Sequence, residues 1–193
     1  MRTVMLVATL LACLSSSTQA QSSRRANARQ GFWVGFGLGS GSAGTNCPSC
    51  STDRSSGLSG YARLGGTLSR SILLGVETNG WAHSEAGVDE SIGFGSVVVL
   101  WYPSPTGALY LQVGLGGMSY RADDGVDQLT ATAPSASIGV GYEMRVGRNM
   151  SLVPYVNSLA SSPVRLRFDG VPVSTSEDIS INLFQFGLGI TWH

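Results

Sequence analysis

The 193-residue sequence has little charge and no lysine. Charged residues make up only 12% of the chain, about half of the roughly 25% that is usual in globular proteins. All 12 basic residues are arginines, and 12 acidic residues balance them to a formal net charge of zero. This balance argues against a basic nucleic-acid-binding protein. It also argues against a disordered chain, which combines low hydrophobicity with high net charge.

Features of helical proteins are also scarce. Glycine is unfavourable inside helices, and this chain has 26 glycines. Beyond the N-terminus, the longest apolar run covers only residues 97–102, far short of the roughly 18 residues that a membrane-spanning helix needs. The sequence therefore favours a β-rich protein, and its apolar content of 42% suggests that its surface does not face water everywhere.

The N-terminus has the pattern of a secretory signal peptide. Arg2 precedes a short apolar stretch, and Thr18-Gln19-Ala20 fits the small-residue cleavage pattern. We expect residues 1–20 to be the signal peptide and residues 21–29 to be a flexible lead-in to a domain covering residues 30–193. In the alternative interpretation, Leu10-Leu11-Ala12-Cys13 is a lipobox and Cys13 is lipidated.

Only two cysteines, Cys47 and Cys50, remain after cleavage. A C-x-x-C pair serves as a redox centre, half of a zinc site or a small disulfide. The flanking Gly, Ser and Thr residues do not fit a redox motif, and a zinc site would have only His83 and His193 as further imidazole ligands. We expect a Cys47–Cys50 disulfide in an exposed loop of an exported protein, with no metal and no cofactor.

From residue 30 onward, apolar residues alternate with small or polar ones, which is the period of a β-strand. In the first such segment, Phe32, Val34, Phe36 and Leu38 alternate with Trp33 and glycines. Eight strands are predicted, at residues 31–39, 58–68, 72–82, 91–102, 108–120, 133–146, 150–160 and 179–193. Their length matches the roughly 9 to 11 residues that cross a bilayer at a tilt.

The connections between these strands alternate in length. Short connections are expected at residues 69–71, 103–107 and 147–149, and longer ones at residues 40–57, 83–90, 121–132 and 161–178. Short turns at one end and long loops at the other are typical of an outer-membrane barrel with an even number of strands. Because a narrow barrel leaves little room inside, we expect the glycine-rich face to line the interior and the apolar face to meet lipid.

These segments resemble the small bacterial outer-membrane β-barrels, the eight-stranded relatives of the OmpA transmembrane domain and OmpX. The resemblance covers residues 31–193 and rests on four short segments. They are Gly31-Phe32-Trp33-Val34-Gly35-Phe36-Gly37, Leu74-Gly75-Val76-Glu77, Leu109-Tyr110-Leu111-Gln112-Val113-Gly114 and Phe186-Gly187-Leu188-Gly189-Ile190-Thr191-Trp192. It implies an all-β, eight-stranded antiparallel up-and-down transmembrane barrel. It also implies a C-terminal aromatic signal for the barrel-assembly machinery, here Trp192, displaced by one position because His193 follows it.

The strand alternation places four charged residues on the inner face. Arg63, Glu77, Glu143 and Arg145 are expected to form ion pairs across the lumen, because unpaired charges in a confined interior are costly. An eight-stranded barrel filled by such side chains has no open channel.

Other polar clusters fall in the predicted loops. Asp123, Asp124 and Asp127 supply carboxylates of the kind that Ca²⁺ binds, without the downstream Glu of an EF-hand. Arg165 and Arg167 have side chains suited to lipopolysaccharide phosphates.

We therefore expect a monomeric outer-membrane scaffold with periplasmic termini, no pore, no catalysis and no nucleic-acid partner. Its expected partners are outer-membrane lipid, lipopolysaccharide and the barrel-assembly machinery. One alternative is a lipocalin-like soluble or lipid-anchored binder, because Gly31-Phe32-Trp33 fits the Gly-x-Trp of a first lipocalin strand. A second is a lipid-modifying enzyme that uses His83 at the barrel rim, beside Ser84 and Glu85.

Overall fold

The computed structural model describes residues 29–47, 54–173 and 178–193. The predicted signal peptide and residues 21–28 of the lead-in lie outside these ranges. The regular elements are β1 (Phe32–Asn46), β2 (Arg54–Ser69), β3 (Ile72–Glu85), β4 (Val88–Trp101), β5 (Leu109–Asp123), β6 (Gln128–Tyr142), β7 (Met144–Arg145), β8 (Met150–Ser161), β9 (Arg165–Phe168), β10 (Val171–Val173) and β11 (Ser180–Trp192). None of these elements is a helix, so the described ranges hold no helix long and apolar enough to cross a membrane.

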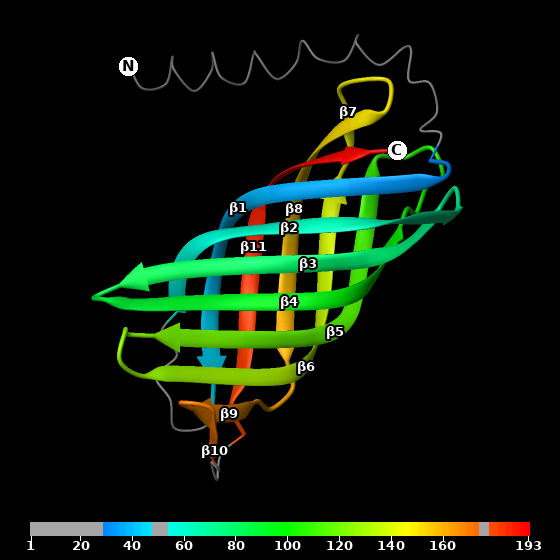
Figure 1. Ribbon diagram of the computed structural model, residues 1–193. Helices are drawn as coiled ribbons and strands as arrows, with labels where there is room; N and C mark the ends of the chain where they lie inside the picture. The colour runs from blue at the N-terminus through cyan, green and yellow to red at the C-terminus, as the bar shows by residue number, and fades with distance from the viewer. Residues whose placement is uncertain (1–28, 48–53, 174–177) are drawn as a thin grey trace, which may run out of the picture.

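The eight long strands close into one antiparallel barrel (Figure 1). Each of them pairs with its neighbour in sequence among the long strands, and β11 closes the barrel by pairing along β1 from Val34↔Trp192 to Asn46↔Ser180. The short β7 extends the edge of β8, while the β9–β10 hairpin adds to β6. The predicted all-β, eight-stranded, up-and-down barrel is confirmed.

The two ends of the barrel differ. β1 begins and β11 ends at what we call the terminal end, whereas the β9–β10 hairpin lies at the opposite, far end (Figure 1). At the far end the strands run past their predicted limits: β1 continues to Asn46, β2 begins at Arg54, and only Ala86 and Gly87 separate β3 from β4. Both turn residues have positive φ, of 52° and 86°, as a tight two-residue hairpin requires.

The predicted strand limits at the far end are wrong for a physical reason. The extensions of β1 and β2 consist largely of Ser, Gly and Thr, and those of β3 and β4 are mostly polar. Neither kind shows an alternation in hydrophobicity, although the backbones pair regularly. The fourth predicted loop, residues 161–178, likewise contains the β9–β10 hairpin. The far end is therefore a sheet that extends the barrel wall, and the described parts of its connections are short.

The outer wall exposes large apolar side chains in its terminal half. Phe36, Leu38, Val97, Leu115 and Leu188 are all more than half exposed. A water-soluble monomer rarely exposes so extensive an apolar surface, whereas a lipid-facing barrel wall requires one. A lipocalin-like soluble binder would not carry this exposed apolar band. The expectation that the glycine-rich face lines the interior is wrong on β4, where Phe94 and Val98 are buried inside and Gly93 and Gly95 lie on the outer side.

The interior is packed in three layers. Near the terminal end lies an apolar cluster, called here the terminal plug: Trp33, Leu73, Val98, Leu100, Tyr102, Tyr110 and Val153. Near the far end lies a second cluster, the far plug: Ala43, Trp81, Ile92, Phe94, Met118, Ala131, Leu159, Ile181 and Leu183. Between them lies a polar layer, and inward-facing glycines give it room, since a Cβ on Gly37 would lie 2.3 Å from the Tyr61 ring.

Candidate functional site

The polar layer is centred on Arg63 of β2 and Glu77 of β3, which face each other in the strand register. Arg63 Nη1 lies 3.9 Å from Glu77 Oε2, and both side chains are almost fully buried. Arg63 also donates hydrogen bonds to Gln112 Oε1 at 3.0 Å and to Tyr110 Oη at 2.9 Å. The guanidinium is therefore held by hydrogen bonds as well as by opposite charge.

Glu77 accepts hydrogen bonds from a residue of its own strand, β3, and from a residue of β5. Asn79 Nδ2 and Gln112 Nε2 donate to Glu77 Oε1 at 2.8 and 2.7 Å. Gln112 thus bridges the Glu77 carboxylate and the Arg63 guanidinium. Three aromatic rings also surround this guanidinium, with centroids 4.7 to 5.7 Å away: those of Trp33, Tyr61 and Tyr110. Such contacts favour a desolvated cation. The layer is a connected network that joins the strands across the lumen.

Glu143 belongs to a second cluster, at the terminal end, where it contacts both ends of the described chain. Arg29 Nη2 donates to Glu143 Oε2 at 3.3 Å, and its guanidinium lies 3.4 Å from the Tyr102 ring centroid. Tyr102 Oη donates to Glu143 Oε1 at 2.6 Å, and His193 Nε2 lies 3.2 Å from the same oxygen. We call these four residues the terminal clasp.

The clasp corrects two expectations. Arg145 is exposed and not in the lumen, because β6 ends at Tyr142 and the alternation of buried and exposed side chains continues only to Met144. Arg29 was expected in the flexible lead-in, yet its side chain is 1% exposed and paired with Glu143. Sequence reasoning missed this pair because 114 positions separate the two residues, and no local pattern connects them.

The clasp makes a testable contribution to stability. Glu143→Gln keeps the side-chain shape but removes the charge that faces Arg29, so we expect the free energy of unfolding to fall by roughly 1–2 kcal/mol. Urea titration of the folded barrel in detergent measures this. Glu85→Gln is the matched control, because the Glu85 side chain is 79% exposed, and we expect no change. Equal midpoints for Glu143→Gln and the unmodified chain would contradict a stabilising role.

The residues of the enzyme alternative do not form a catalytic arrangement. His83 Nε2 lies 3.2 Å from Glu85 Oε2, but the Ser84 hydroxyl donates to Asp89 instead of to His83. His83 also stacks on Trp81, with ring centroids 5.9 Å apart. A serine nucleophile requires a base within hydrogen-bond reach, and this geometry does not provide it.

The acidic cluster at the tip of the β5–β6 connection is organised by its own backbone. Backbone N–H groups of Val126 and Asp127 donate to Asp124 Oδ1 at 2.9 and 2.8 Å. These hydrogen bonds, that of Asp127 first, lower the pKa of Asp124. Within the described ranges, no group of three or more His, Cys, Asp or Glu side chains is placed to hold a metal ion.

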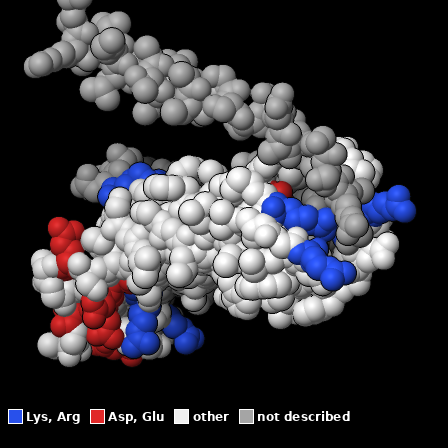
Figure 2. Space-filling view, turned by 90° about the horizontal axis from the view of Figure 1, so that it is seen from above, with Lys and Arg blue, Asp and Glu red and all other residues white. Residues whose placement is uncertain are grey.

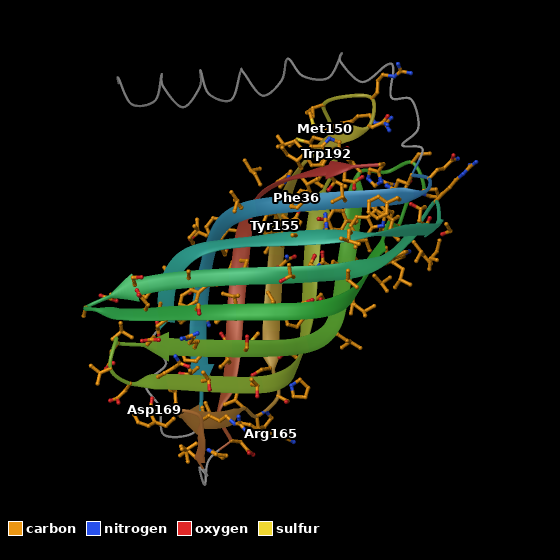
Figure 3. All side chains as sticks on the ribbon, in the orientation of Figure 1. Phe36, Met150, Tyr155, Arg165, Asp169 and Trp192 are labelled. Carbon is orange, nitrogen blue, oxygen red and sulfur yellow. The ribbon has the colours of Figure 1, made fainter. Side chains whose placement is uncertain are left out.

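The remaining predicted site residues lie at the ends of strands. Cys47 directly follows β1, and Cys50 lies outside the described ranges, so their disulfide stays a prediction. Trp192 ends β11 on the outer wall, where its ring meets Phe36 edge-on at 6.4 Å. In Figure 3, Trp192, Phe36 and Met150 gather at the terminal end, while Arg165 and Asp169 lie at the far end.

No known family model matches this chain, and no curated protein sequence matches it. Solved structures do resemble it. Neisserial surface protein A aligns with a TM-score of 0.56 and 14% identity, over 83% of this chain and 96% of that one. Ail, the attachment invasion locus protein of Yersinia pestis, aligns with a TM-score of 0.52 and 10% identity, over 84% and 99%.

The chain has the fold of the small outer-membrane β-barrels. At these identities the likeness concerns the fold alone. Within such a barrel, the apolar outer wall is the lipid-facing surface, and the plugs and polar layer fill the interior. The far-end sheet and the terminal clasp lie beyond the apolar belt of the barrel.

Proposed function

We propose that this protein is a sealed outer-membrane scaffold that carries neither a pore nor a catalytic site and acts through its far end. The observation that carries the proposal is the filled interior. Trp33 and Tyr102 in the terminal plug are 0% exposed, as is Leu159 in the far plug. The terminal plug, the polar layer and the far plug together leave no continuous aqueous path, in keeping with the packed interior of eight-stranded barrels.

The proposed orientation places the terminal end in the periplasm and the far end outside the cell. The connections at the terminal end are short, and the far end carries the longer strand extensions and the β9–β10 hairpin. This asymmetry is typical of outer-membrane barrels, whose periplasmic turns are short. In this orientation Trp192 faces the periplasmic side, and we propose it as the residue that the barrel-assembly machinery recognises. The barrel is proposed to work as a monomer.

Conductance across a planar bilayer tests the sealed interior. We expect no stable current steps from the refolded protein. Trp81→Ala combined with Phe94→Ala removes the two largest side chains of the far plug and should also stay closed, because the terminal plug is intact. A stable open channel in the unmodified protein would contradict the proposal.

Thiol labelling of whole cells tests the location and the orientation. After reduction, a membrane-impermeant maleimide should label Cys47 and Cys50 in intact cells, since Cys47 lies at the far end of β1. Labelling only after the outer membrane is opened would reverse the proposed orientation. Release of the protein by a carbonate wash would contradict its insertion in the membrane.

A further inference from the structure

Three arginines share one face of the outer wall at the far end. Strand register places Arg121 of β5 opposite Thr130 of β6, and Thr130 opposite Arg167 of β9. Two residues closer to the terminal end, Arg165 of β9 lies opposite Thr132 of β6. Residues directly opposite each other in an antiparallel pair point to the same face, so all three guanidinium groups belong to the outer wall.

The height of these arginines coincides with the edge of the hydrocarbon layer. The lipid-facing band of such barrels is about 25 Å tall and its strands tilt by about 40°, so about ten residues of each strand cross it, at about 3.3 Å per residue. Ten positions from Trp101, at the terminal end of β4, lies Ser91, whose register partner is Arg121. The same count from Tyr142 on β6 reaches Thr132, whose partner is Arg165.

A count along β1 places a fourth arginine, Arg54, at a similar height. Ten positions from Phe32 on β1 lies Ser42, and Arg54 Nε donates to the Ser42 hydroxyl at 3.0 Å. Between the two charged ends, the face seen in Figure 2 shows an uncharged wall, with acidic side chains and arginines side by side at one end. The arginines therefore stand where the outer leaflet places its phosphate groups, in the orientation proposed above.

Between the arginines and the terminal end, the outer wall carries a patch of glycines without side chains, called here the bare patch. Gly80 faces Gly93, and Gly95 faces Gly117, across neighbouring strands. A Cβ on Gly80 or Gly95 would meet nothing within 4 Å, and one on Gly117 would have its nearest neighbour at 3.9 Å. Packing within the protein therefore does not require glycine at these positions, and glycine in a strand often marks close approach by a ligand or another backbone.

This bare surface continues into an apolar groove on the lipid-facing wall. The groove has a volume of about 600 Å³ and includes Gly95 of the bare patch. Its other outward-facing residues include Phe36, Ala62, Thr78, Val97 and Leu115. From Arg121 to Leu115 is six residues along β5, about 20 Å, so one amphiphile can reach from the arginines into the groove.

We propose that this face binds a phosphorylated outer-leaflet lipid, lipopolysaccharide, with its lipid A phosphate on Arg121, Arg165 and Arg167 and its acyl chains on the bare patch and groove. Guanidinium groups suit this ligand because they bind phosphate through two parallel hydrogen bonds. Asp123 Oδ2, which accepts from Arg121 Nη2 at 3.2 Å, occupies one of the five N–H donors of that guanidinium. The orientation in the cell rests on the proposed function, but binding itself does not.

Native mass spectrometry of the refolded full barrel in detergent tests the proposal with bisphosphorylated lipid A as the probe. We expect Arg165→Gln and Arg167→Gln each to weaken binding by about tenfold, the scale of one charge-assisted hydrogen bond, and the triple variant with Arg121→Gln to weaken it further. Arg70→Gln/Arg148→Gln, which removes two exposed arginines from the terminal-end turns, is the matched control and should bind as the unmodified barrel does.

A second variant tests the lipid-facing patch separately. Gly80→Leu/Gly117→Leu should fold normally, because the added side chains point into open space, but should bind lipid A more weakly. Unchanged binding by the arginine triple variant, or equal binding of dephosphorylated lipid A, would overturn the proposal. Complete displacement of lipid A by inorganic phosphate would identify a free-phosphate site, and a stable dimer through this face would identify a second copy as the occupant. Either result would overturn it.

Failure here is distinguishable from failure of the proposed function. The binding measurement uses the purified barrel and is independent of its orientation in the cell. Conductance and whole-cell labelling report the sealed interior and the orientation without lipid A. If the barrel is sealed and oriented as proposed but its binding of lipid A does not depend on the phosphates, the proposed function still stands.

Discussion

Glu77→Leu is expected to lower the free energy of unfolding by about 3–5 kcal/mol, because it leaves the Arg63 guanidinium buried without its partner charge. Arg63 is 2% exposed, so water does not compensate. Asn79 and Gln112 also lose the acceptor oxygen to which they donate. Denaturant titration of the barrel in lipid vesicles measures the loss, and the folded band on unheated gels should melt at lower temperature.

A double-mutant cycle identifies the cause of that loss. Arg63→Met combined with Glu77→Leu removes both charges and should cost less than the sum of the two single changes, because replacing a buried ion pair by apolar residues is often tolerated. Glu77→Gln, which keeps an acceptor oxygen for Asn79 and Gln112, should lie between the unmodified chain and Glu77→Leu. Unchanged stability of both single variants would show that the pair does not hold the layer together.

Gly39→Val is expected to prevent closure of the barrel. Gly39 of β1 faces Gly187 of β11 at the closing seam, and a Cβ on Gly39 would lie 2.0 Å from the Phe186 carbonyl oxygen. The clash is with backbone and not with a movable side chain, so we expect a loss of about 3 kcal/mol or more. The measurement is the fraction of refolded protein that shifts on unheated gels.

Gly66→Val is the matched control for the seam. Gly66 lies on β2, and a Cβ at this position would meet nothing within 4 Å. The control therefore adds the same side chain to a barrel strand without the backbone contact, and we expect it to refold at the normal yield. If Gly39→Val refolds as well as Gly66→Val, close approach of the two backbones at the seam is not required for closure.

The sequence predicts the barrel wall well where the alternation is strong. Phe32, Val34 and Phe36 face outward and Trp33 inward, as the period of two requires. The strand ends were harder to predict, because residues 40–46 and 54–57 are small or polar on both faces. These residues pair through backbone hydrogen bonds, which a pattern of side-chain hydrophobicity does not predict.

The interior was predictable only in part. Arg63 and Glu77 are each placed by the alternation of their own strand, and the first short turn fixes the register between them. Glu143 shows the limit, because its partners Arg29, Tyr102 and His193 come from distant parts of the chain. The arginine face at the far end likewise depends on β9 pairing with β6, a long-range contact that hydrophobic period does not encode.

The terminal clasp has a practical consequence for anyone who handles this protein. The His193 side chain is 8% exposed and turned toward Glu143, and its backbone N–H donates to Asn149 O at 3.0 Å. An affinity tag fused to the C-terminus would therefore follow directly on a residue that is held by contacts at the terminal end of the barrel. The Ala86–Gly87 turn, exposed and at the opposite end, is the better site for an epitope, a dye or a purification handle.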